Sequence, residues 1–202
     1  MNRDHWEAIH ATKQDQVSWY QDRPSLALTF IQACDLAPGA TVLDAGAGAS
    51  RMVESLLDLG LRPTVADIAQ SALDRVRERL GARADEAALL CIDLTQAELP
   101  EAAFDLWHDR AVFHFLTEPG QRAAYLTRMK RALKPGGFVV LGCFAPDGPE
   151  KCSGLPVRRY DAAGIAAELG PEFELLEEGR ETHSTPFGTT QAFTVVRFRF
   201  KG

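Results

Sequence analysis

The stretch VLDAGAGASRMVESLLDLG, residues 42–60, indicates a strand, a turn and a helix in direct succession. The strand is apolar up to Asp44, and the turn contains Gly46 and Gly48. Apolar residues then recur at helical spacing: Val53, Leu56 and Leu57. A strand that turns on glycines into a helix is the usual ligand-binding unit of an α/β sheet. We therefore expect a ligand at this turn.

The residues around the turn argue against a phosphate ligand. A phosphate-binding turn reads Gly-x-Gly-x-x-Gly and points helix amides at the anion. Here Arg51 occupies the third glycine position, and Asp44 lies two residues before the first glycine. A carboxylate repels a pyrophosphate and attracts an ammonium or sulfonium group. The turn therefore favours a cationic nucleoside without phosphate, and it disfavours a nicotinamide-dependent oxidoreductase.

Strands and helices alternate on both sides of this unit. Strands are expected at residues 40–45, 62–68, 88–94, 104–108 and 138–144, and two more at 173–178 and 192–200. Helices are expected at residues 24–34, 69–80, 121–133 and 162–170, the last capped by Asp161. The alternation predicts a parallel sheet with helices on both faces and with the fourth and fifth strands at its centre. The last strand, which alternates apolar residues with Arg197 and Arg199, is expected near an edge.

Two further acids end strands on the same side of the predicted sheet. Asp67 lies nineteen residues after Gly48, the usual place for an acid that holds ribose hydroxyls. Asp93 ends the third strand, near the place where an adenine amino group would lie. The alternative for these acids, and for Asp44, is that they cap the helices that follow them.

At these residues the chain resembles the class I S-adenosylmethionine-dependent methyltransferases. The matching motifs are VLDAGAGAS (42–50), VADI (65–68), CIDL (91–94), FDLWHDRAVFHFL (104–116) and LKPGGFVVL (133–141). The resemblance is strong from Ala40 to Phe144 and weak beyond. It implies a doubly wound, Rossmann-like α/β fold with a seven-stranded, mostly parallel sheet and an antiparallel last strand. It also implies a single domain over residues 1–202, with the N-terminal segment 1–37 over the donor site.

S-adenosylmethionine is the methyl donor that this resemblance implies. The residues expected at the donor come from the strand ends, the fourth strand and the N-terminal segment: Asp44, Gly46, Gly48, Arg51, Asp67, Ile68, Asp93, Leu94, His108 and Trp19. No metal is expected, because the four cysteines form no Cys-x-x-Cys pair and no group with the histidines.

The acceptor side has its own candidates. Methyl transfer is an in-line displacement, so the protein chiefly holds the acceptor close and aligned, and an amine or hydroxyl acceptor usually also needs a base. The candidate catalytic residues are His114, Asp109, Arg110 and Tyr20. Their structural alternatives are an ion pair between Asp109 and Arg110, a buried histidine at 114, and an aromatic anchor formed by Tyr20 with Trp19.

Cysteines and one late histidine are further acceptor-side candidates. Cys152 lies in the long Pro/Gly-rich loop 144–157, and loops of this length are often functional. Cys143 fits a core thiol near the end of an apolar strand. His183 follows late in the chain, in the stretch THSTPFG.

Composition limits the partners and the location. The 202 residues carry a formal net charge of −6, so they offer no basic footprint for nucleic acid. The N-terminus is polar, and no apolar stretch is long enough to span a membrane, which predicts a cytoplasmic protein without a membrane partner. The oligomeric state is left open.

The acceptor is expected to be a small molecule. The sequence suggests no added domain to grip a protein, and the exit of the fourth strand lacks the Asn-Pro-Pro-Tyr type of motif of members that methylate amides or amino bases. A thiol, sulfide or metalloid acceptor is the preferred hypothesis. The alternatives are a protein lysine methyltransferase and, from another class, a non-catalytic module that binds S-adenosylmethionine.

Overall fold

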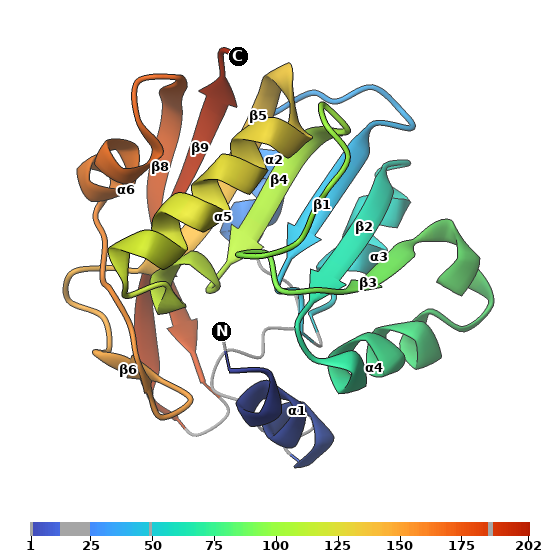
Figure 1. Cartoon of the computed structure of the whole chain (residues 1–202), viewed down its shortest axis with the longest axis horizontal. Helices are drawn as coiled ribbons and strands as arrows, with labels where there is room; N and C mark the ends of the chain where they lie inside the picture. The colour runs from blue at the N-terminus through green and yellow to red at the C-terminus, as the bar shows by residue number, and fades with distance from the viewer. Residues whose placement is uncertain (1, 13–24, 49, 186–187) are drawn as a thin grey trace.

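A computed structural model of the chain describes residues 2–12, 25–48, 50–185 and 188–202. Its centre is a seven-stranded sheet of order β3-β2-β1-β4-β5-β9-β8 (Figure 1). The strands are β1 (Thr41–Ala45), β2 (Arg62–Asp67), β3 (Ala88–Cys91), β4 (Phe104–Arg110), β5 (Leu133–Phe144), β8 (Phe173–Ser184) and β9 (Thr190–Phe200). The strands from β3 to β5 pair in parallel, and β9 runs antiparallel to both β5 and β8. The predicted doubly wound α/β fold with an antiparallel last strand is confirmed.

The strand order also shows where the fourth, fifth and last predicted strands lie in the sheet. β4 lies at the centre with β5 beside it, as predicted. β9 lies one position in from the edge, because β8 pairs with its outer side and takes the edge itself. Arg197 of β9 donates from Nη2 to Glu177 Oε2 of β8 at 3.0 Å, so its charge faces a partner strand.

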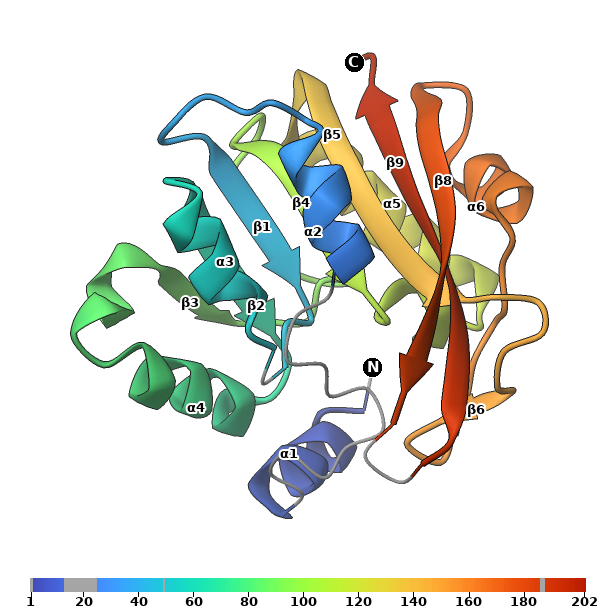
Figure 2. The same cartoon turned by 180° about the vertical axis from the view of Figure 1, so that it is seen from behind.

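Helices cover both faces of the sheet. α5 (Pro119–Ala132) and α6 (Ala162–Leu169) lie over the face seen in Figure 1, and α2 (Ser25–Gln32) and α3 (Met52–Asp58) lie over the opposite face (Figure 2). α4 (Gln70–Leu80) shares a buried cluster with α3 and β2. The predicted cap is present, since Asp161 Oδ1 accepts from Gly164 N at 2.7 Å and begins α6.

Two segments differ from simple strand and helix. The loop after β5 contains a small hairpin of β6 (Lys151–Cys152) and β7 (Leu155–Pro156). β5 begins immediately after α5, and its register with β4 jumps from Phe104↔Leu133 to Leu106↔Phe138. The KPGG stretch therefore makes an irregularity at the start of β5. Two short 3₁₀ helices follow α4 and β4, at Gly81–Glu86 and Phe113–Phe115.

The core forms on both faces of the sheet. One cluster joins β1, β4 and β5 to α5 and α6 and includes the fully buried Trp107, Tyr125 and Phe198. The other joins the same strands to α2 and α3 and includes Phe144 and Phe193. These layers hold the carboxyl ends of β1, β2 and β4 side by side at one end of the strands, where α1 (Arg3–Thr12) also lies (Figure 1).

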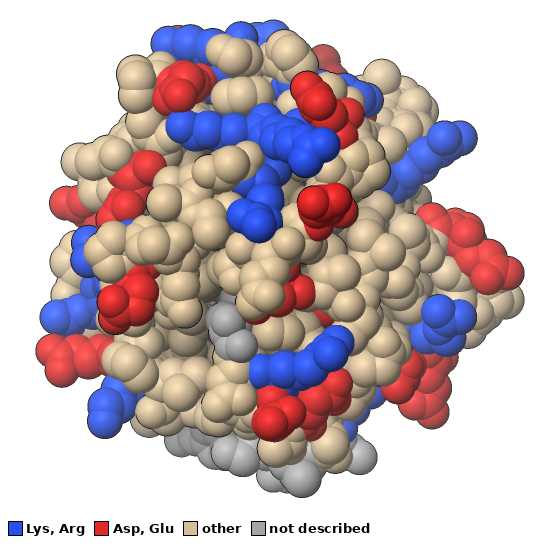
Figure 3. All heavy atoms as spheres, viewed as in Figure 1, with Lys and Arg blue, Asp and Glu red and all other residues tan. Residues whose placement is uncertain are grey.

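Charges of both signs are interspersed over the face of the molecule seen in Figure 3. Within the described residues, no helix combines the length and the apolar character that crossing a membrane requires.

Candidate active site

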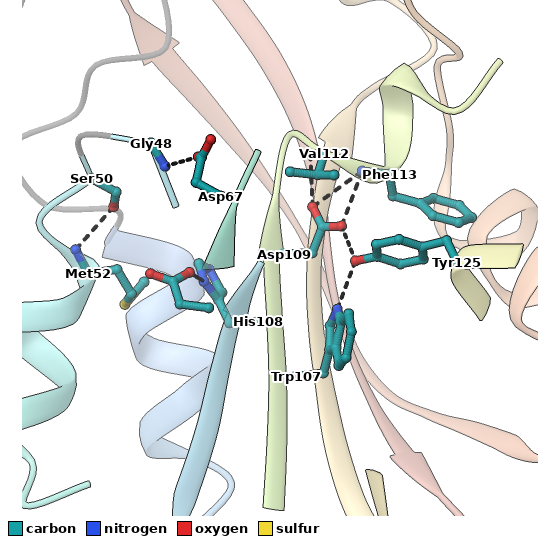
Figure 4. A network of polar contacts seen from close by, with 11 residues as sticks. Gly48, Ser50, Met52, Asp67, Trp107, His108, Asp109, Val112, Phe113 and Tyr125 are labelled. Atoms are coloured by element: carbon teal, nitrogen blue, oxygen red, sulfur yellow. Dashed lines mark hydrogen bonds and ion pairs between the residues drawn. The ribbon is translucent and has the colours of Figure 1, made fainter. Parts of the chain in front are cut away.

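The glycine turn connects the end of β1 to α3. Gly46 has a φ of +60° and Gly48 a φ of +55°, values that side-chain-bearing residues rarely adopt. The turn is tied to β2, because Gly46 N donates to Ala66 O at 2.7 Å and Gly48 N donates to Asp67 Oδ2 at 2.8 Å. Figure 4 shows the second of these contacts. The turn is thus fixed to the neighbouring strand rather than held by its own residues alone.

Asp44 and His108 form a buried pair next to the turn. They lie opposite each other on β1 and β4, and His108 Nδ1 is 2.6 Å from Asp44 Oδ1. Both side chains are buried, with 2% and 3% of their surface exposed. The remaining polar atoms, Asp44 Oδ2 and His108 Nε2, have no hydrogen-bond partner in the described part of the chain. A buried carboxylate oxygen in this condition is costly, which makes it a place for a ligand donor.

Asp67 braces the turn and faces the same site. Its Oδ2 accepts from Gly48 N, and its Oδ1 accepts from Ala69 N at 2.8 Å. Burial raises the pKa of Asp67, while the neighbouring His10 and the backbone N–H groups of Ala69 and Gly48 act in the opposite direction. Because each carboxylate oxygen has two lone pairs, Asp67 can still accept from a ligand hydroxyl.

A polar network holds the exit of β4 (Figure 4). Asp109 Oδ1 accepts from Val112 N at 2.9 Å, and Asp109 Oδ2 accepts from Phe113 N at 3.1 Å and from the Tyr125 hydroxyl at 2.5 Å. Trp107 Nε1 donates to the same Tyr125 oxygen at 2.7 Å. Burial raises the pKa of Asp109 to about 6 despite these hydrogen bonds. The carboxylate therefore fixes the backbone that follows β4.

The network places Val112 against the glycine turn. A β-carbon on Gly46 would lie 1.9 Å from Val112 Cγ2, so only glycine fits there. Ala111, just before Val112, has a φ of +72°, an uncommon value for a residue other than glycine. Its amide donates to Gly142 O at 2.9 Å, which ties this turn to β5.

A cavity opens where the glycine turn, the ends of β2 and β4, and α1 meet. Its lining combines apolar side chains with few polar groups, as ligand sites usually do. The lining residues are Trp6, His10, Gly46, Gly48, Ala66, Asp67, Ile68, Ile92, Leu94, Arg110, Ala111, Val112, Phe115 and Cys152.

Arg110 brings a buried cation to this cavity. Its Nη2 is 3.6 Å from Glu181 Oε1, and its guanidinium carbon lies 4.5 Å from the centre of the Phe193 ring. Its side chain is only 12% exposed. Burial lowers the pKa of Arg110, and the charge of Glu181 raises it. The guanidinium is thus held between a carboxylate and an aromatic face.

Comparisons with known proteins agree with this fold. Residues 42–137 match a family described as a methyltransferase domain. The family match and the relatives below support a class I methyltransferase. Its sequence is 29% identical over 114 residues to the eEF1A lysine and N-terminal methyltransferase of Mus musculus, covering 53% of this chain and 15% of that protein. It is 31% identical over 108 residues to the malonyl-[acyl-carrier protein] O-methyltransferase of Serratia marcescens, covering 54% and 40%.

A solved structure extends the likeness over the whole chain. The N-methyltransferase NodS from Bradyrhizobium japonicum, in complex with S-adenosyl-L-homocysteine, superposes with a TM-score of 0.74 at 19% identity and covers 98% of this chain and 99% of that one. The chain spans less than half of the length of the two curated relatives above.

The structure brings half of the expected donor residues to the cavity. Gly46, Gly48, Asp67, Ile68 and Leu94 line it. Asp44 and His108 form the buried pair beside the turn without appearing in its lining. Trp19, like the candidate catalytic residue Tyr20, lies outside the described residues.

Two other expected donor residues do not line the cavity. Asp93 Oδ1 accepts from Thr95 N at 2.8 Å and from Thr95 Oγ1 at 2.6 Å, so its carboxylate closes a turn after β3. Arg51 is exposed and directly precedes α3. Neither belongs to the lining of the cavity.

Of the candidate catalytic residues in the described part of the chain, Arg110 alone lines the cavity. The carboxylate oxygens of Asp109 are engaged by the β4 exit and Tyr125. His114 is fully buried, its Nδ1 accepts from Phe144 N at 3.4 Å, and its ring packs on Phe144 and Phe115. Burial, together with the charge of Arg110, lowers the pKa of His114 to about 3.

Sequence reasoning missed part of the lining. Trp6 and His10 reach the cavity from α1, and Phe115 and Val112 reach it from the β4 exit. Trp6 and His10 are four residues apart, so helical spacing could have placed them on one face. The spacing gave no sign of what that face packs against. Both cysteines are buried in the core, and of the two only Cys152 lines the cavity.

Proposed function

We propose that this chain binds S-adenosylmethionine in the cavity and transfers its methyl group to a small nucleophile. The observation that carries the proposal is the buried Asp44 oxygen beside a glycine turn, which has no hydrogen-bond partner among the described residues. The charge of this carboxylate favours an ammonium group and opposes a pyrophosphate. When bound, the donor supplies an electrophilic methyl group on a positively charged sulfur.

The remaining donor contacts follow from the lining. Gly46 and Gly48 allow the donor to approach the backbone closely, and Asp67 accepts from the ribose hydroxyls. Ile68, Ile92 and Leu94 offer an apolar surface for the adenine ring. Asp44 and Asp67 thus anchor opposite ends of the donor. The proposal does not use Asp93 and Arg51, which are outside the lining of the cavity.

The acceptor side favours an anionic or easily ionised nucleophile. Arg110 lines the cavity as a cation, so it attracts a thiolate or an oxyanion and repels a lysine ammonium group. An amine would also need a base, but Asp109 is engaged by hydrogen bonds and His114 has a pKa of about 3. A thiol ionises at a pKa of about 8.5 and needs little help. A thiol, sulfide or metalloid acceptor fits these groups best.

Protein lysine methylation is the second candidate. The name of the Mus musculus relative favours it, but that relative is much longer than the aligned region. Lysine methylation requires a deprotonated amine beside Arg110. The described lining residues offer only His10 and Asp67 as bases, and both lie on the donor side.

The decisive experiment is incubation with radiolabelled donor and a panel of acceptors. The panel contains low-mass thiols, sulfide, arsenite, phenols and a cell lysate. We expect label in a methylated thiol, sulfide or metalloid. Label that appears only in protein bands overturns the small-acceptor proposal in favour of lysine methylation. Donor binding by calorimetry without label in any acceptor identifies a non-catalytic binding module instead.

A further inference from the structure

α4 lacks a side-chain cap of its own. Its N-cap residue is Ala69, which has no side chain that can accept a hydrogen bond. The first amides of the helix are instead bound by Glu7 of α1: Gln70 N donates to Oε1 at 2.6 Å, and Ser71 N donates to Oε2 at 3.1 Å. A carboxylate is favourable there because the N-terminus of a helix carries partial positive charge. Glu7 therefore caps a helix that begins 63 residues later.

Arg3 adds a second polar attachment. Its Nε donates to Ile68 O at 3.0 Å, and its Nη2 donates to Cys91 Sγ at 2.8 Å. The apolar contact adds Trp6 and Ile9, which form a buried cluster with Ala69 and Ala72, and Ile68, Phe115 and Leu155 pack against this cluster. A ten-residue helix is marginal on its own in water. The position of α1 thus depends on its packing and on its polar attachments, which include the Glu7 cap of α4.

This attachment brings two side chains to the donor half of the cavity. Trp6 and His10 both line it, beside Asp67 and Ile68. The Trp6 ring packs edge to face on Phe115, with 5.0 Å between the ring centroids. The centroids of the Trp6 and His10 rings are 6.2 Å apart. His10 is 5% exposed although it belongs to a surface helix. The helix therefore places an imidazole at the acid that we assign to the ribose.

We propose that His10 is a donor-positioning residue that acts on the ribose together with Asp67, and that the Glu7 cap of α4 holds it there. The proposal rests on the proposed function, because it needs a nucleoside in the cavity. A neutral imidazole has one donor and one acceptor nitrogen, which complements the hydroxyls of a ribose. Asp67 offers acceptors only, so the two side chains together match both hydrogen-bonding roles of the sugar.

The charges around His10 fit this role. Asp67 of β2, Arg75 of α4 and Glu7 of α1 act on it, and burial outweighs them and lowers its pKa. His10 is therefore neutral at pH 7. A neutral ring avoids a permanent ion pair with Asp67 that would compete with the sugar.

The test compares binding of S-adenosylhomocysteine and of adenosine to four variants by calorimetry. His10→Ala should weaken both ligands about tenfold, the loss of a hydrogen bond of about 1.4 kcal/mol. His10→Gln, which keeps a donor and an acceptor, should recover most of that loss. Glu7→Gln should weaken both ligands severalfold and increase amide hydrogen exchange in α1. Asp4→Asn, on the same helix, should behave as the wild type.

Turnover provides a readout that a merely structural role would not give. With donor at saturation, His10→Ala should keep the wild-type kcat while its KM for the donor rises about tenfold. Wild-type affinity in His10→Ala, or equal losses in His10→Ala and His10→Gln, overturns the proposal while leaving the proposed function intact. Failure of the wild type to bind S-adenosylhomocysteine overturns the proposed function, and this inference with it.

Discussion

Val112 packs so closely on Gly46 that a β-carbon at position 46 would lie 1.9 Å from Val112 Cγ2. The contact joins the exit of β4 to the turn after β1, the two segments that meet where the sheet order reverses. In doubly wound sheets the ligand binds at this reversal. The space for the donor is therefore set by two backbone turns that support each other.

The first prediction tests that contact. Gly46→Ala should abolish measurable donor binding, because Val112 or the turn must move. Gly60→Ala is the matched control: Gly60 also has a positive φ, of +72°, but nothing lies within 4 Å of its added β-carbon. Gly60→Ala should lose only the stability that the strained backbone conformation costs, about 1 kcal/mol.

A second-site change separates packing from strain. Adding Val112→Ala to Gly46→Ala removes the Cγ2 atom and leaves the Val112 Cβ position at 3.3 Å. We expect the double variant to recover part of the donor affinity in calorimetry. If the double variant binds no better than Gly46→Ala alone, steric contact with Val112 is not the reason that glycine is required.

Asp44 is predicted to recognise the positive charge of the donor. Asp44→Asn keeps an oxygen for His108 and removes the charge. It should weaken S-adenosylmethionine and S-adenosylhomocysteine by about 1.5 to 3 kcal/mol, the scale of hydrogen bonds to charged groups. Methylthioadenosine, which carries neither the ammonium nor the sulfonium group, should bind the variant and the wild type equally. An equal loss for all three ligands would point to a distorted turn instead.

Asp67 is predicted to hold the ribose. Asp67→Ala should cost about 1.5 to 3 kcal/mol of donor binding, or roughly 10- to 150-fold in Kd. The variant also removes the braces on Gly48 N and Ala69 N, so a probe must isolate the sugar contact. The 2′,3′-dideoxy form of S-adenosylhomocysteine should bind both proteins with similar affinity. Unchanged affinity for the natural ligand would refute the ribose role.

The fold was accessible from sequence because its signals are local. The strand, glycine turn and helix at residues 42–60 are adjacent in the chain, and the acids at strand ends follow at regular intervals. Gly46, Gly48 and Asp67 can therefore be assigned to one site from the sequence alone. The position of β9 inside β8 was less accessible, because both are long strands at the end of the chain and only their pairing shows which one takes the edge.

The roles that sequence left open depend on distant partners. The sequence allows an ion pair between Asp109 and Arg110. In the structure the partners of Asp109 are Tyr125 of α5 and the amides of Val112 and Phe113, and Arg110 lies beside Glu181 of β8. The spacing of Trp6 and His10 indicates a shared helix face but not where that face packs, because the place of His10 in the cavity depends on Glu7 capping α4 across 63 residues. Such contacts are tertiary, and no periodicity in the chain encodes them.

Arg110 is predicted to select the acceptor. Arg110→Gln should raise the KM for a thiol acceptor about tenfold or more, because it removes the cation that attracts the thiolate, while donor Kd changes less. Steady-state kinetics and calorimetry give the two quantities separately. Arg110→Lys keeps the charge and should retain more activity than the glutamine variant. Equal activity of all three proteins would remove Arg110 from the acceptor site.

His114 is predicted to stabilise the fold rather than to act as a base. Its pKa falls from 6.5 to about 3 in the folded protein, so between these values the unfolded chain binds a proton that the native protein does not. Stability from the neutral ring is therefore complete above pH 6.5 and is lost as the pH falls toward 3, by on the order of 5 kcal/mol. His114→Leu should remove this dependence, so urea unfolding at pH 7 and pH 4.5 should show a smaller difference for the variant than for the wild type.

The turnover of His114→Leu at pH 7 should stay within about threefold of the wild type if the packing against Phe144 is kept, because a general base contributes 10²- to 10⁴-fold. A large loss of kcat with unchanged donor affinity would instead return His114 to the catalytic residues, and parallel pH curves for the two proteins would contradict the assigned pKa.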